Sequence, residues 1–222
     1  MRSQLIIAAY ILASCAAADA GTIANLPQGI ATFSGDMEMA VPPSSVRRQA
    51  YESDASVRVF LERETLSTSI PVNAVQPGVY SAYADFDDQA LQPTGKIRSY
   101  FIHFDGGGVS LRPLMGSVTF EAPILGVIGR SLTLEQTDTD FGAQGTLYPT
   151  DRFNREPEYQ GRGNYDYFEI GADQRTLSFH WKVTTDVDQL RVITAVPEPY
   201  SLGMSVLGIF LFTIASPRRG SR

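Results

Sequence analysis

The sequence predicts an all-β fold: an antiparallel β-sandwich, for which a jelly roll is one arrangement, flanked by an N-terminal signal peptide and a C-terminal transmembrane helix. Two observations predict the sandwich. Short runs of alternating apolar and polar residues recur along the chain, and clusters of glycine, proline and aspartate separate them. In addition, no window between residues 21 and 195 sustains a helical period. We therefore expect about eight to ten short strands.

The clearest strand runs from Thr176 to Val183, because its odd-numbered residues are apolar and its even-numbered residues are polar. Trp181, the single tryptophan, lies on the apolar side and is expected to be buried between the two sheets. A second strong strand spans residues 97–104. The same pattern predicts further strands at residues 22–26, 57–61, 78–84, 116–121, 124–128, 131–135 and 190–194.

Composition and patterning divide the chain into four parts. Residues 1–20 form a signal peptide, residues 21–50 an N-terminal strand and a linker, residues 51–195 the β-sandwich domain, and residues 196–222 a C-terminal signal. Without the first and last parts, about 175 residues remain, which is enough to bury one sizeable core.

The first 20 residues have the pattern of a secretory signal: one basic residue, an apolar run, and small residues before the cleavage site. Ala18 and Ala20 form the A-x-A site, so we expect export by the Sec machinery and cleavage by signal peptidase after Ala20. Residues 12–15 also resemble a lipobox, in which Cys15 would be lipidated. Cleavage after Ala20 is favoured because the chain has a second anchor at its other end. Cys15 is the only cysteine, so a protein cleaved after Ala20 has no cysteine and no disulfide.

The C-terminal 27 residues have three successive parts. Pro197, Glu198 and Pro199 come first, an apolar membrane segment within residues 200–216 follows, and a basic tail at 217–222 holds Arg218, Arg219 and Arg222. As a helix, the apolar core of this segment (residues 202–215) would rise about 21 Å, less than the roughly 30 Å thickness of a bilayer interior. It is therefore a marginal permanent anchor but an adequate transient one. The positive-inside rule keeps the arginines in the cytoplasm and the Pro-Glu-Pro motif outside.

This tail resembles the PEP-CTERM sorting signal of bacterial surface proteins. The resemblance implies that an exosortase, a membrane-embedded processing enzyme, recognises Pro197, Glu198 and Pro199. Residues 99–105, 116–128, 145–149 and 188–194 also resemble segments of one group of secreted PEP-CTERM proteins, over roughly residues 95–195. That likeness implies a β-sandwich that is held transiently at the inner membrane and then placed at the cell surface or in the extracellular matrix.

The charge of the body argues against nucleic acid as a partner. The net charge of the chain is −6, residues 1–20 sum to zero and residues 196–222 to +2, so residues 21–195 hold −8. No catalytic motif of the G-x-S-x-G, H-E-x-x-H or P-loop type occurs, and no enzymatic activity is expected. A secreted hydrolase remains an alternative, and it would need a pocket that places His103 or His180 against a carboxylate.

Calcium is the one metal that the sequence suggests, and no other cofactor is expected. Asp138 and Asp140 alternate within residues 137–142 and are followed by Gly142, which partly matches an oxygen-ligand loop. A third acidic position and the distal bidentate glutamate are absent. Two further acidic turns lie at residues 85–88 and 186–188.

Two binding functions are the remaining alternatives. A carbohydrate-binding module, with exopolysaccharide as its partner, is suggested by aromatic residues in a stretch rich in Gly, Asn, Asp and Arg: Tyr148, Phe153, Tyr159, Tyr165 and Tyr167. The same aromatics could instead cap the core. Ice binding is the other alternative, because similar tails occur on ice-binding proteins. A flat ice-binding face would need regularly spaced threonines, and the sequence contains no such repeat.

Overall fold

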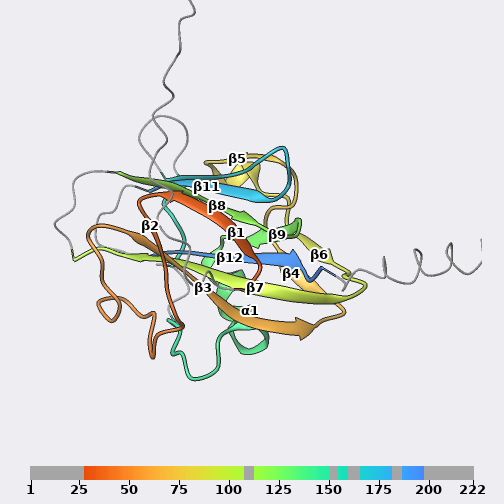
Figure 1. The fold of residues 1–222 in the computed structure, drawn as a ribbon, viewed down its shortest axis with the longest axis horizontal. Helices are drawn as coiled ribbons and strands as arrows, with labels where there is room; N and C mark the ends of the chain where they lie inside the picture. The colour runs from red at the N-terminus through yellow and green to blue at the C-terminus, as the bar shows by residue number, and fades with distance from the viewer. Residues whose placement is uncertain (1–27, 108–112, 151–154, 160–165, 182–186, 198–222) are drawn as a thin grey trace, which may run out of the picture.

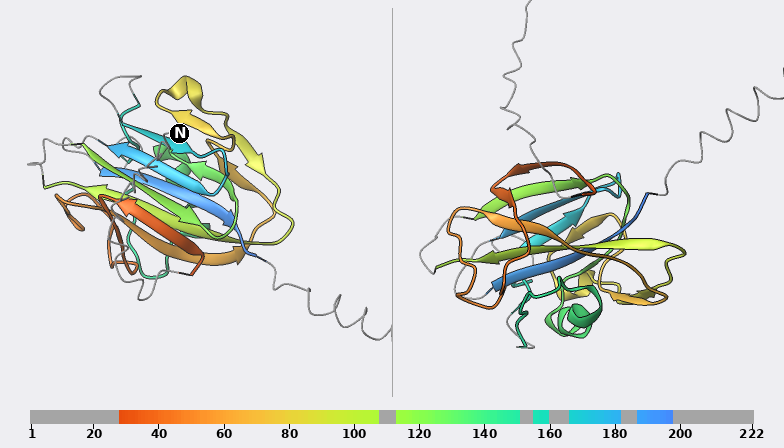
Figure 2. Two further views of the ribbon diagram at one scale, coloured as in Figure 1. Left: turned by 45° about the horizontal axis from the view of Figure 1, so that its top comes forward. Right: turned by 60° about the horizontal axis from the view of Figure 1, so that its bottom comes forward.

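The computed structural model describes residues 28–107, 113–150, 155–159, 166–181 and 187–197. In these residues two five-stranded sheets pack face to face, and one α-helix lies on the outer side of the second sheet (Figures 1 and 2). The predicted all-β, largely antiparallel architecture is therefore confirmed. The predicted signal peptide and the tail from Glu198 onward lie outside the described residues. Within the ranges given above, no helix has the length and apolarity needed to cross a membrane.

The first sheet is antiparallel throughout and has one face in the core and one toward solvent. Residues of β11 alternate between buried and half-buried, with Leu177, Phe179 and Trp181 on the buried side. The alternation predicted for residues 176–181 is thus confirmed, and Trp181 is completely buried. In spatial order the strands are β1 (Ile30–Gly35), β8 (Leu114–Phe120), β11 (Thr176–Trp181), β10 (Tyr167–Ile170) and β5 (Gly78–Tyr80).

The second sheet is buried on both faces. Every residue of its central strand from Ile97 to Asp105 is buried, so the strand does not show a simple alternation of burial. All neighbours are antiparallel except β2 and β3, which run parallel. The strands in spatial order are β2 (Met37–Met39), β3 (Val57–Leu66), β7 (Lys96–Asp105), β12 (Val187–Ala195) and β9 (Ile124–Ile128).

Two apolar clusters explain why the second sheet is buried on both sides. The larger cluster fills the space between the sheets and contains Trp181, Tyr100 and Leu190. The smaller one lies on the far side of the second sheet, where Phe60 and Phe101 meet α1 (Ser131–Phe141). A short two-stranded sheet of β4 (Ile70–Val72) and β6 (Gln89–Leu91) adds Ile70 and Val72 to this second cluster.

The helix α1 corrects the sequence prediction, which placed a strand at residues 131–135 and expected no helix in the body. Figure 2 (right) shows α1 against the face of the second sheet that points away from the first. Its buried residues are Ser131, Leu134, Thr137 and Phe141, which have helical spacing. Two of these four are polar, so a search for apolar periodicity does not detect the helix.

The N-terminal part of the body also differs from the prediction. Strands β1 and β2 fall within residues 21–50, and each belongs to one of the two sheets. The sandwich therefore begins before residue 51, and residues 30–39 are not a linker. The strand predicted at residues 78–84 ends at Tyr80, because a 3-10 turn, η1 (Tyr83–Asp85), follows it. The Asp85 carboxylate accepts the backbone N–H groups of Ser81 and Ala82 at 2.8 Å each and so stabilises that turn.

Candidate functional site

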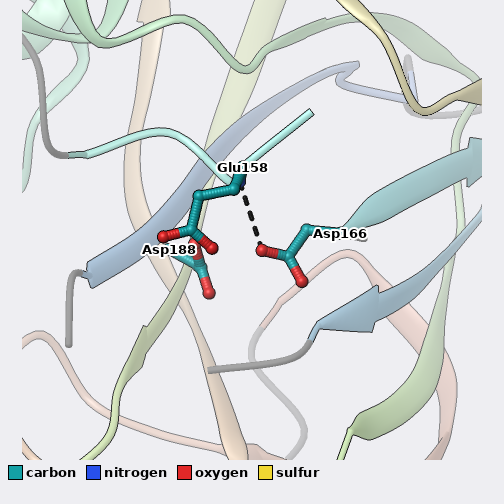
Figure 3. A group of neighbouring side chains, drawn as sticks. All are labelled: Glu158, Asp166 and Asp188. Carbon is teal, nitrogen blue, oxygen red and sulfur yellow. Dashed lines mark hydrogen bonds between the residues drawn. The ribbon is translucent and has the colours of Figure 1, made fainter. Parts of the chain in front are cut away.

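Three carboxylates meet at one end of the space between the sheets. Glu158, Asp166 and Asp188 each offer an oxygen, and these oxygens all lie within 4.8 Å of one another (Figure 3). Asp166 immediately precedes β10 of the first sheet, and Asp188 is in β12 of the second. Glu158 comes from the segment 155–159, which lies between them. Asp166 and Asp188 are almost completely buried, and Glu158 is half-buried.

Strand alternation places the two aspartates. Asp188 has the same parity as Leu190 and Val192, whose side chains lie in the core between the sheets. Asp166 likewise has the same parity as Phe168, which packs into the same core from the first sheet. The backbone N–H of Glu158 donates to the Asp166 carboxylate at 3.2 Å and brings the third carboxylate alongside.

The cluster has the ligand chemistry of a hard divalent cation. Its members are all carboxylates, and oxygen ligands of this kind suit Ca²⁺ better than the nitrogen and sulfur ligands that zinc prefers. The negative charge of the cluster also acts on its neighbour Tyr159. Burial raises the pKa of the Tyr159 phenol well above its ordinary value, and the charges of Glu156, Asp188 and Asp166 raise it further. Sequence reasoning singled out Asp188 as part of an acidic turn but missed Glu158 and Asp166.

The calcium loop predicted at residues 137–142 is not a loop. Asp138 and Asp140 lie in the last turns of α1, where side chains two residues apart do not face each other. The Asp138 carboxylate instead accepts from Arg155 at 2.7 Å and from Arg191 at 2.9 Å. Helical geometry therefore separates the two carboxylates that the prediction brought together.

Asp138 belongs to a buried ion network that also contains Glu62, Arg155 and Arg191. Arg191 is fully buried and binds Glu62 through two parallel hydrogen bonds of 2.7 and 2.8 Å. Burial alone would lower the pKa of Arg191, but the charge and hydrogen bonds of Glu62, with Asp138, hold it above its ordinary value. Two cations and two anions balance one another, so this network binds α1 to the second sheet without a net charge.

The two histidines lie on different sheets and have different environments. His103 is completely buried, stacks on Tyr51 and Phe101, and meets Gln189 at 3.1 Å. His180 is half-buried on the outer face of the first sheet, stacked on Tyr167 at 5.1 Å between ring centroids. The hydrolase alternative needs a histidine that is hydrogen-bonded to a carboxylate. Within the described ranges, neither histidine has such a partner.

The structure describes two of the three tyrosines at 159, 165 and 167 that the sequence suggested for sugar binding, and it buries one of them. Tyr159 is buried among Tyr83, Phe86 and Phe168, and its hydroxyl donates to the Gly129 carbonyl at 3.3 Å. Its ring therefore cannot stack on a saccharide, and the prediction for Tyr159 is wrong. Tyr167 lies on a different surface beside His180, and Tyr165 lies outside the described residues.

The outer face of the first sheet carries two short rows of hydroxyl groups. The first row runs across the paired strands β1, β8 and β11 and consists of Thr32, Thr119 and Thr176. The second row lies two residues further along the same strands and consists of Ser34, Ser117 and Ser178. The Ser34 and Ser117 hydroxyls are 2.9 Å apart, and those of Thr119 and Thr176 are 3.0 Å apart. Each row combines residues from distant parts of the chain, so no sequence repeat predicts it.

No family model, no curated protein and no solved structure matches this chain, so its function is argued from its own residues.

Proposed function

We propose that this protein is an exported β-sandwich protein of the cell surface or extracellular matrix, without catalytic activity, that an exosortase sorts through residues 196–222. The observation that carries the proposal is the order of the three parts of the tail: Pro197-Glu198-Pro199, then the short apolar segment, then Arg218, Arg219 and Arg222. A short apolar segment followed by arginines stops translocation with the Pro-Glu-Pro motif outside the membrane.

The folded body supports this proposal because its sheets are complete before the motif. The last strand, β12, ends at Ala195, and the N–H of Val196 donates to the Lys96 carbonyl at 3.0 Å. Pro197, the last residue that the structure describes, takes no part in either sheet. Cleavage near Pro197 would therefore release the body without breaking a strand pairing.

Replacement of Pro197, Glu198 and Pro199 by alanine tests the proposal, because it leaves the apolar length and the arginines unchanged. In a host that carries an exosortase, this variant is expected to be exported but to accumulate unprocessed in the membrane fraction. The measurements are membrane fractionation and mass spectrometry of the C-terminal peptide. Pro42→Ala, which changes an exposed proline of the body, is the matched control and should be processed normally. Processing and release of the alanine variant at the wild-type level would refute the proposal.

A further inference from the structure

A pocket of about 660 Å³ opens at the end of the second sheet where the chain leaves the body. It lies between the end of β3, the loops at residues 67–69 and 92–95, and the last turn of α1. The backbone carbonyl of the neighbouring Lys96 accepts a hydrogen bond from the N–H of Val196, the last residue before the Pro-Glu-Pro motif. In Figure 1 this is the end toward which β12 points. We call it the terminal pocket.

The polar groups of the terminal pocket are only partly used by the protein itself. Thr65 and Ser67 donate their hydroxyls to nearby backbone carbonyls. The hydroxyls of Thr68, Thr94 and Thr139 have no such partner within the part of the chain that the structure describes. Three hydroxyl groups, each both a donor and an acceptor, are therefore available to a ligand.

One cation and one anion complete the lining. Arg63 donates one N–H to the backbone carbonyl of Asp140 at 3.1 Å, which leaves its other N–H groups and the exposed Asp140 carboxylate available to a ligand. The nearby Glu64 is shared by Lys96, at 3.1 Å, and Arg98, at 3.2 Å. Because Arg63 and Asp140 balance, the pocket has no excess charge that would favour a phosphate group or a metal cation.

The chemistry of this lining fits a neutral saccharide. Adjacent ring hydroxyls of a sugar donate to a carboxylate, accept from a guanidinium and exchange hydrogen bonds with threonine hydroxyls. The side chain of Leu66, 71% exposed, and Pro93 give apolar surface for the C–H face of the ring. The volume lies within the range of pockets that enclose small organic ligands.

We propose that the terminal pocket is a binding site for a neutral mono- or oligosaccharide, recognised by Arg63, Asp140 and the hydroxyls of Thr68, Thr94 and Thr139. This site is distinct from the tyrosines that the sequence suggested for the same class of ligand. The proposal is independent of how the chain is sorted, since it concerns only residues of the folded body.

The test uses the full chain in a polyoxyethylene detergent, because detergents with sugar head groups would compete for the site. Neutral oligosaccharides of glucose, galactose, mannose and N-acetylglucosamine are screened on a glycan array, and the best one is titrated by calorimetry. Asp140→Asn and Thr94→Val are each expected to weaken binding about tenfold, the effect of losing one hydrogen bond to a polar ligand.

Thr176→Val is the control with the same substitution, because it removes a threonine hydroxyl from the outer face of the first sheet, where that hydroxyl is bound to Asp173 and Thr119. It is expected to bind the saccharide as the wild type does. Thermal melting of each variant verifies that it is folded, and Thr68→Val replaces any variant that is not. Binding that none of the pocket variants weakens would overturn the proposal. The absence of binding to every neutral saccharide up to about 10 mM, or binding of acidic glycans alone, would do the same.

Discussion

His103 shows how far burial changes the chemistry of one residue. Its ring is enclosed between Tyr51 and Phe101, and its Nε2 atom has no hydrogen-bond partner within the described residues. Burial lowers the pKa of His103 to about 3, and the positive charges of Arg58 and Arg155 act in the same direction. The histidine is therefore neutral at neutral pH, where burial disfavours its protonated form.

This environment predicts a loss of stability in mild acid. The pKa of His103 in the folded state lies below the ordinary value of 6.5. As the pH falls, this histidine is therefore protonated in the unfolded chain before it is protonated in the folded protein. The contribution of neutral His103 to the free energy of unfolding is complete above about pH 7.5 and decreases toward pH 3. Between about pH 7.5 and pH 5 the free energy of unfolding should fall by about 2 kcal/mol through this residue. Urea unfolding across this range is the measurement.

His103→Asn is the matched variant, because its amide oxygen can take the place of Nδ1 next to Gln189. It should be less stable at neutral pH but show a flatter pH dependence. Burial raises the pKa of the nearby Asp105, which opposes the trend by favouring the folded state as the pH falls. The comparison at equal pH removes that contribution because both proteins contain Asp105. If the free energy of unfolding fell equally steeply with pH in both proteins, the loss of stability in acid could not be assigned to His103.

At the scale of elements, α1 depends on residues that are distant in the chain. No side chain of its own caps its first turn. The Glu156 carboxylate instead accepts the Ser131 N–H at 2.7 Å, and the Asn73 amide oxygen accepts the N–H groups of Gly129 and Arg130 at 3.0 Å each. The other end is held by Asp138 through Arg155 and Arg191. The helix is thus stabilised by tertiary contacts more than by local ones.

Removal of the Asp138 charge tests this dependence. Asp138→Asn leaves Arg155 and Arg191 buried with only Glu62 as a counter-charge, so we expect a loss of about 3–5 kcal/mol in the free energy of unfolding. Asp140→Asn is the control, because Asp140 is exposed on the same helix; its effect should stay within about 0.5 kcal/mol. Both values come from urea denaturation. Similar losses for the two variants would show that the buried ion network does not hold the helix.

At the scale of the whole molecule, the acidic cluster lies where the two sheets and the segment 155–159 meet. Glu158, Asp166 and Asp188 come from three separate parts of the chain, so a cation bound there would link them in the folded state alone. Calcium is therefore expected to raise the melting temperature. Preferential binding to the folded state adds about 2.7 kcal/mol at a concentration one hundred times the dissociation constant.

Differential scanning calorimetry with millimolar calcium, against a chelated sample, measures this effect. Asp188→Asn should abolish the rise, whereas Glu169→Gln, which changes an exposed carboxylate of β10, should keep it. Unchanged melting temperatures for the wild type with calcium and with chelator would show that the cluster holds no calcium.

Local pattern was enough to predict several elements of this fold. The burial of Trp181 followed from the alternation in β11, because a strand with one face in a core shows its period in its own sequence. The strands at β7 and β9 were also predicted, but both belong to the sheet that is buried on both faces, so their burial does not alternate. The sorting signal at residues 196–222 is likewise a property of contiguous residues. It stays a prediction, since Glu198 and everything after it lie outside the described residues.

The tertiary structure alone decided the helix α1, the buried ion network, the acidic cluster and the terminal pocket. The buried side of α1 includes Ser131 and Thr137, whose hydroxyls accept hydrogen bonds from residues that are distant in the chain. The Arg155 backbone N–H donates to Ser131 at 3.2 Å, and Arg191 donates to Thr137 at 2.7 Å. The acidic cluster and the pocket each combine residues from three or more segments. A period in the sequence reports on one element at a time. Sites made where elements meet depend on strand order and register, which local sequence does not determine.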